Sequence, residues 1–184
     1  MDWYAIVKFL HIACSVVWVG GGFTLMLLAV RAERSGNVES MLQAMRATGE
    51  LGNRLFAPLS LLTLAFGLVM CGFWVGFSDL WIVIGLVGYL TTFAVGMLVF
   101  KPTADRMARM IAADGVTPAA LAQGRRILTA ARFDYSVMLV IVADMVLKPT
   151  LDDGFVLGAM ALVVLGGAAL ALSGDARARR PAHA

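Results

Sequence analysis

The stretch YAIVKFLHIACSVVWVGGG, residues 4–22, decides the fold class. Its apolar character continues past Leu28, so as a helix it can cross the roughly 30 Å of hydrocarbon in a bilayer. Two ionisable residues, Lys8 and His11, interrupt the apolar run. Each costs about 2.5–3.5 kcal/mol or more in hydrocarbon when it is unpaired. We therefore expect both to face protein.

The polar residues of this segment share one side of the predicted helix, because they recur at offsets of three and four positions. They are Tyr4, Lys8, His11, Ser15, Trp18 and Gly22. We expect this side to contact other helices and the Val, Leu and Ile residues to face lipid.

The composition supports an integral membrane protein. Of the 184 residues 60% are hydrophobic and the mean hydropathy is +0.85, whereas soluble domains are about 45–50% apolar. The segment lacks a charged n-region and a cleavage site, which indicates a retained helix. A pI of about 9.2 raises the question of nucleic acid, but the basic residues lie beside the spans. The lipid bilayer is the predicted partner, and nucleic acid is not.

The fold class predicted is all-α: a polytopic bundle of five transmembrane helices in a single domain, residues 1–174, followed by a disordered basic tail, 175–184. The predicted spans are 4–30, 55–77, 80–100, 130–148 and 154–173.

The basic residues predict the orientation of the bundle. All Lys and Arg residues except Lys8 and Lys148 lie in the first and third connections or in the tail. In a five-span protein these segments share one side of the membrane. The positive-inside rule then places the N-terminus outside and the C-terminus in the cytoplasm.

Small residues predict close helix packing. They recur at helical spacing in the second, third and fifth spans, where they let backbones approach in lipid. The recurring positions are Ser60, Thr63, Gly67, Cys71 and Trp74 in the second span, Gly85, Gly88, Thr92 and Gly96 in the third, and Gly158, Ala161, Leu165 and Ala168 in the fifth. Before the fourth span, Thr117 as N-cap and Pro118 at the first helical position predict the start of a helix.

The fourth span carries an acid near each end. Asp134, Ile141, Asp144 and Lys148 share one face of this predicted helix. At 1.5 Å per residue His11 lies roughly 10 Å, and Asp144 roughly 6 Å, below the outer boundary. Lys8, His11 and Asp144 are therefore predicted to meet.

Two interpretations of this cluster stay open. In one, His11 binds a metal and Asp144 or Lys8 fixes its tautomer. In the other, Lys8 and Asp144 form a structural ion pair and His11 is hydrogen-bonded to a neighbouring helix. At the cytoplasmic boundary, Asp134 is predicted to pair with Arg54 or Arg132 as an anchor.

The choice of metal ligands is narrow, because the only other histidine, His183, lies in the tail. A haem held by two histidines of one chain is thus excluded, which leaves an open site, a Met or Lys ligand, or His11 from a second copy. Met70 and Met145 are the candidate Met ligands, although packing explains each. Met70 with Cys14 and Cys71 gives a weaker prediction of Cu(I).

The first helix also resembles a known group of proteins. The run Lys8-Phe-Leu-His11, followed by Trp18-Val-Gly20, is similar to the opening of small bacterial membrane proteins that include HemJ-type protoporphyrinogen oxidases and CopD-type copper-resistance proteins. With Arg54-Leu-Phe-Ala-Pro58 and Met145-Val-Leu-Lys148-Pro149, the chain most resembles an uncharacterised family of predicted integral membrane proteins within that group. The resemblance covers residues 3–150.

The resemblance implies a multi-pass protein of the bacterial inner membrane in which His11 ligates haem b, with Lys8, Asp144 and Trp18 around it. The expected role is electron transfer or oxidoreduction with a quinone or porphyrin, in a homo-oligomer or beside a partner subunit. The alternatives are a non-catalytic accessory subunit and a copper-handling protein. The further His and basic motifs of the HemJ-type proteins are missing, so protoporphyrinogen oxidation is not implied.

Overall fold

The computed structural model describes residues 1–178, and side chains up to residue 173. Every regular element in this part of the chain is helical. The chain forms two compact units, which divide between Asp79 and Leu80. Each unit is described by itself.

The first helix of unit 1 is α1 (Trp3–Ser35). It begins at Asp2, whose side chain accepts a hydrogen bond from the amide of Ala5 and so satisfies one of the free N–H groups of the first turn. It ends at Gly36, whose φ of 65° is the left-handed conformation that glycine adopts at low cost. Asn37 then caps the next helix.

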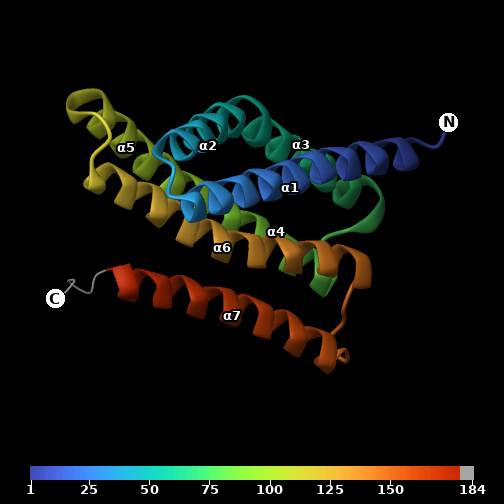
Figure 1. Cartoon of the computed structure of the whole chain (residues 1–184). Coiled ribbons are helices and arrows are strands. Elements are labelled where there is room, and N and C mark those ends of the chain that lie inside the picture. The colour runs from blue at the N-terminus through green and yellow to red at the C-terminus, as the bar shows by residue number, and fades with distance from the viewer. Residues whose placement is uncertain (179–184) are drawn as a thin grey trace. The chain divides into compact units, whose positions relative to one another are not determined.

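The second helical segment of unit 1 contains four consecutive elements. Figure 1 shows that the chain changes direction between α2 and α3. The change falls at a π-helical turn, where helices commonly bend. Pro58, which has no N–H to donate, is the second residue of the helix that follows. The elements are α2 (Val38–Leu51), η1 (Gly52–Phe56), α3 (Ala57–Met70) and η2 (Cys71–Val75).

Helices α1 and α3 pack side by side and antiparallel (Figure 1). Three contacts fix the register. The Tyr4 ring meets the edge of Trp74 at 5.7 Å between centroids, His11 reaches Thr63, and Gly21 lies against the ring of Phe56. The absence of a side chain at Gly21 is therefore required for this packing, because a Cβ atom there would be 2.6 Å from Phe56.

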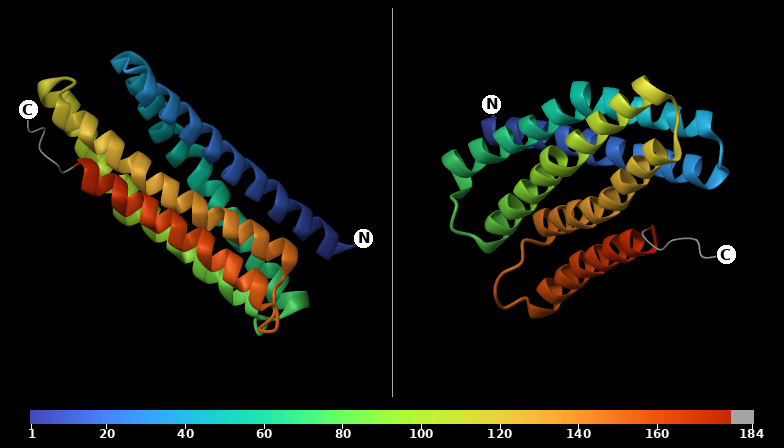
Figure 2. Two further views of the ribbon diagram at one scale, coloured as in Figure 1. Left: turned by 60° about the horizontal axis from the view of Figure 1, so that its bottom comes forward. Right: turned by 90° about the vertical axis from the view of Figure 1, so that its left-hand side faces the viewer.

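In unit 2, α6 packs against α4, α5 and α7 (Figure 2). Thr117 accepts a hydrogen bond from the amide of Ala120 and α6 begins at Pro118, which confirms the predicted start. The elements of the unit are α4 (Leu80–Val95), η3 (Gly96–Phe100), α5 (Lys101–Asp114), α6 (Pro118–Leu147) and α7 (Gly154–Ala178).

Four helical segments of the described chain are long and apolar enough to cross a membrane: Trp3–Ser35, Val38–Val75, Leu80–Asp114 and Gly154–Ser173. The fifth predicted span, 130–148, corresponds to the last part of α6 and the residue that caps it, Lys148. This helix has the length, but Arg132, Asp134 and Asp144 interrupt its apolar stretch. The structure thus supports an all-helical membrane protein with four apolar segments, and the fifth span stays a prediction.

The helices also run past the predicted spans. Residues 38–54 and 101–114, predicted to connect spans, are largely helical and continuous with them. Helix α7 is described as far as Ala178, inside the tail predicted to be disordered, and the rest of that tail lies outside the described residues. The predicted single domain across residues 1–174 stays a prediction.

The small residues of α4 pack as predicted, and those of α7 do so only in part. A Cβ atom at Gly88 would lie 2.6 Å from Cγ1 of Ile141, and Gly85 touches the Cε methyl of Met145. On α7, the predicted contact residue Gly158 has open space beside it, whereas Gly167 packs against Ser136. Gly167 is therefore a position of close contact with α6, and Gly158 is not.

Candidate functional site

The side chain of His11 lies on α1 and reaches the backbone of α3. Its Nδ1 atom is 2.7 Å from the main-chain carbonyl oxygen of Thr63. A carbonyl oxygen can only accept, so Nδ1 carries the proton and donates it. In a neutral imidazole this places the lone pair on Nε2, which is the atom that a metal would bind.

Gly67 makes this contact possible. A residue four positions after Thr63 stands over the Thr63 carbonyl on the surface of α3. Because Gly67 has no side chain, the imidazole can approach: a Cβ atom there would be 3.2 Å from Cε1 of His11 and 3.4 Å from Nδ1. The sequence pattern marked Gly67 only as a packing residue.

The polar side of α1 is half-buried, as predicted, with the exception of Lys8. Tyr4, His11, Ser15, Trp18 and Gly22 are all half-buried. On the opposite side of α1 the residues are exposed, including Phe9, Ile12 and Val16.

Lys8 departs from this pattern because it is exposed. Its Nζ atom lies 5.6 Å from the centroid of the Tyr4 ring, a cation–π contact within α1. Tyr4 in turn packs on Trp74. In unit 1 the charge of Lys8 therefore lies against an aromatic pair, a partner that the sequence did not indicate.

Asp144 lies in unit 2, at the contact between α6 and α4. It is fully buried, and within residues 1–173 neither carboxylate oxygen has a hydrogen-bond partner. A Cβ atom at Gly85 would lie 3.4 Å from Oδ2. A buried and unpaired carboxyl group in an apolar helix marks a functional position by default. The predicted meeting of Lys8, His11 and Asp144 joins the two units and stays a prediction.

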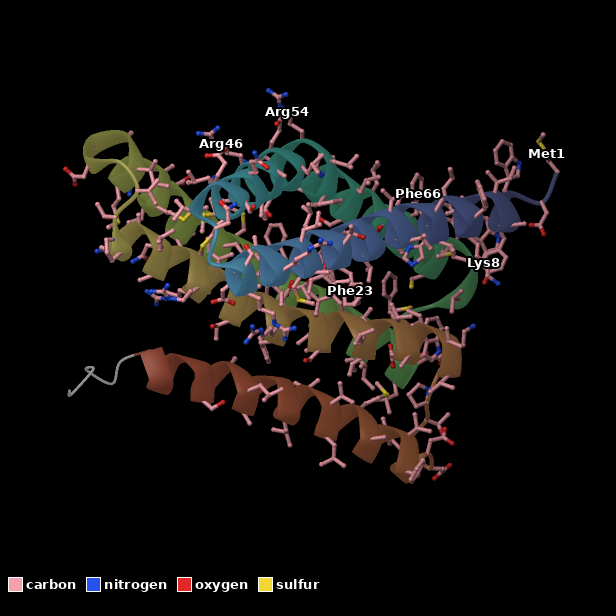
Figure 3. All side chains as sticks on the ribbon, in the orientation of Figure 1. Met1, Lys8, Phe23, Arg46, Arg54 and Phe66 are labelled. Atoms are coloured by element: carbon pink, nitrogen blue, oxygen red, sulfur yellow. The ribbon has the colours of Figure 1, made fainter. Side chains whose placement is uncertain are left out.

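The predicted ion pair between Arg54 and Asp134 would join the two units. Arg54 donates to Glu50 at 3.0 Å in unit 1, and its side chain is 80% exposed. Figure 3 shows Arg46 and Arg54 pointing away from their helices. Asp134 is buried in unit 2, and its Oδ1 has no hydrogen-bond partner among the described side chains. A pair between Arg54 and Asp134 therefore remains a prediction.

The predicted sulfur ligands fall in different units. Met145 packs its Cε methyl on Gly85 in unit 2. Met70 belongs to unit 1 and follows Gly67 by three residues, on the same side of α3. Cys14 and Cys71 are free and half-buried. In the described part of the chain no three His, Cys, Asp or Glu side chains gather as a metal site.

Together, the apolar helices and the ionisable side chains held against them define a polytopic α-helical membrane protein. The chain belongs to the family described as "Predicted integral membrane protein (DUF2269)", which matches residues 5–149. No curated protein and no solved structure matches the chain. The predicted relation to HemJ-type and CopD-type proteins stays a prediction.

Proposed function

We propose that this protein binds a haem b, or a similar metalloporphyrin, through Nε2 of His11. The observation that carries the proposal is the hydrogen bond from Nδ1 of His11 to the Thr63 carbonyl. Metal-ligating histidines almost always donate the second ring N–H to a carbonyl or carboxylate, because this fixes the tautomer and orients the ring. No hydrogen bond to Nε2 is found among the described residues.

The surrounding residues fit such a group. Gly67 leaves room for the ring at the surface of α3. Trp18, two turns along α1 from His11 and on the same side, offers an aromatic surface to a flat ligand. Of the two predicted Met ligands, Met70 is the better candidate, because it lies in the same unit as His11 and on the side of α3 that faces it.

A haem bound here would supply one-electron chemistry, and the protein would set its potential through the ligand opposite His11 and through nearby charges. Within unit 1 the cation of Lys8 lies one turn from His11 on α1. A positive charge favours the more electron-rich form of a redox group, so Lys8 would raise the potential. The exchange partner proposed is a lipid-soluble quinone or porphyrin.

The cellular setting proposed is the bacterial inner membrane. In a five-span protein the distribution of Lys and Arg supports an N-terminus outside and a C-terminus in the cytoplasm. A homo-oligomer or a partner subunit would cover the exposed apolar faces not used by lipid.

The test is an absorption spectrum of the protein purified in detergent from cells supplied with a haem precursor. A Soret band is expected for the wild-type chain. His11→Ala should lose the band, whereas His183→Ala should keep it, since His183 is the other histidine of the chain. A band that survives in His11→Ala would contradict the ligand, and a colourless but stable wild-type protein would contradict haem binding altogether.

The same preparation tests the two alternatives. A colourless protein that co-purifies with another membrane protein indicates an accessory subunit. Bound copper that depends on Met70 and Cys71 indicates copper handling. Either result would replace the haem proposal.

A further inference from the structure

One end of unit 2 holds a cation in an unusual backbone position. Lys148 ends α6 with a φ of 48°, and it is the only residue other than glycine with a positive φ in the described chain. Glycine or asparagine normally occupies this left-handed position, because a Cβ atom makes it unfavourable for other residues. A lysine at this position points to a use for its side chain.

The ammonium group of Lys148 lies over an aromatic ring. Its Nζ atom is 4.8 Å from the centroid of Trp81, in the first turn of α4. Within the described residues no carboxylate lies at ion-pair distance from Lys148. Asp144, one turn back on α6, is fully buried. The exposed cation therefore keeps hydrogen-bond donors for an anion that comes from outside.

Unit 2 also has an apolar groove between three of its helices. Its volume is about 400 Å³. Ile84 of α4 and Val140 of α6 line it, with Leu157, Met160, Ala161 and Val164 of α7. Helices α4 and α7 each pack against α6 (Figures 1 and 2).

The cation and the groove lie at matching positions. Ile84 follows Trp81 by one turn on the same side of α4, and Val140 precedes Lys148 by two turns on the same side of α6. Leu157 is in the first turn of α7. The groove thus begins about one turn from the Lys148–Trp81 pair and continues toward the middle of the apolar helices.

We propose that Lys148, Trp81 and this groove form a binding site for an anionic phospholipid. The phosphate of the headgroup would bind the Lys148 ammonium, and one acyl chain would lie along the groove. An acyl chain gains little free energy by moving from the bilayer into the groove, since the two surroundings are equally apolar. Selection among lipids therefore depends on the charge, because a lysine at the membrane surface attracts anionic headgroups. The proposal concerns unit 2 alone and does not depend on His11.

The experiment measures quenching of Trp81 fluorescence by brominated lipid. Trp3, Trp18 and Trp74 are replaced by Phe, so Trp81 is the only tryptophan left. The protein is placed in vesicles of phosphatidylglycerol and phosphatidylcholine in equal amounts, with bromine on either one or the other. Because the bilayer composition is the same in both, only the position of the label changes. Brominated phosphatidylglycerol is expected to quench about twofold more strongly.

Three variants test the parts of the site. Lys148→Asn, which tolerates the left-handed backbone, should remove the preference. Ala161→Phe, which fills the groove, should reduce it. Lys101→Gln, at the first residue of α5 and about five turns along the helical segment from Trp81, should leave it unchanged.

Equal quenching by the two lipids in the wild-type background would overturn the proposal without any variant, because the contact would then be unselective. A preference that survives in Lys148→Asn would also overturn it. If a small fraction of isoprenoid quinone relieves the quenching and excess unlabelled phosphatidylglycerol does not, the occupant is a quinone and the phospholipid proposal is wrong.

Discussion

Gly67 of α3 lies directly against the imidazole ring of His11 of α1. A Cβ atom at Gly67 would be 3.2 Å from Cε1 and 3.4 Å from Nδ1. The distance to Cε1 is shorter than most carbon contacts, so a Cβ atom at Gly67 requires the ring to shift by a few tenths of an ångström. The same ring donates a hydrogen bond to the carbonyl of Thr63, one turn earlier. Because Gly67 has no side chain, the His11 ring can lie close enough to donate this hydrogen bond, which fixes its tautomer.

If His11 binds haem as proposed, we predict that Gly67→Ala weakens the His11–Thr63 hydrogen bond and lowers haem retention, and that Gly67→Val abolishes haem retention. Overpacking of this kind costs about 1–3 kcal/mol. Soret absorbance per protein and the unfolding midpoint in detergent measure the two effects. Gly20→Ala is the matched control, because nothing lies within 4 Å of a Cβ atom at Gly20. Full haem retention in Gly67→Val would contradict the assigned role of the contact.

The contact between α4 and α6 gives a second prediction. Gly88→Ala would place a Cβ atom 2.6 Å from Cγ1 and 3.0 Å from Cδ1 of Ile141. We expect a loss of about 1–3 kcal/mol in the free energy of unfolding. Removing both atoms with Ile141→Ala should relieve the clash, so the double variant loses less than the sum of the two single variants.

Gly158→Ala is the control for Gly88→Ala. A Cβ atom at Gly158 meets nothing within 4 Å, so this variant should show no loss and gain up to about 1 kcal/mol from its higher helix propensity. Additive effects of Gly88→Ala and Ile141→Ala would show that α4 and α6 do not pack as described.

The positions of helices could be predicted well from the sequence, and their ends less well. Thr117 and Pro118 predicted the start of α6 because capping is local chemistry. The continuation of α4 through α5 to Asp114 was missed, because hydropathy marks where lipid ends rather than where a helix ends. A positively charged loop and a positively charged helix have similar hydropathy, so a hydropathy pattern does not distinguish them.

The candidate site shows the same limit. His11 and Asp144 stood out because ionisable groups are rare in apolar segments. The partner of His11 did not, because a main-chain carbonyl is present at every residue and has no sequence signal. The only trace of it was Gly67 in a stripe of small residues, which ordinary packing also explains. The contact of Lys148 with Trp81 was not predicted, because it depends on the register between α4 and α6, which has no signal in the sequence.

The loop before α7 gives a prediction about pH. The backbone N–H and the hydroxyl of Thr150 donate to Oδ2 of Asp153 at 2.8 and 2.9 Å. These hydrogen bonds, the backbone one foremost, hold the pKa of Asp153 below its usual value. Their stabilising contribution is present above the ordinary carboxyl pKa of about 3.9. It is lost as the pH falls through the lowered value in the folded protein.

An NMR titration of the Asp153 carboxyl carbon measures this shift. Thr150→Val removes the hydroxyl donor and keeps the amide, so the midpoint should move up by only part of the shift. An unchanged midpoint in Thr150→Val would show that the hydroxyl does not contribute.

The predicted number of spans can be decided by labelling single cysteines on either side of α6. Asp114 and Asp152 are exposed and flank the helix, and each is changed to Cys after Cys14 and Cys71 are replaced by Ser. If α6 crosses the membrane, a membrane-impermeant maleimide added to intact spheroplasts labels Cys at 152 and spares Cys at 114. If α6 does not cross, the two positions lie on one side and label together. Lysed cells, in which both positions are accessible, are the control.

We expect labelling at 152 alone, because Asp134 and Asp144 are buried against protein rather than exposed. An ionisable residue that avoids lipid in this way does not prevent a helix from spanning the membrane.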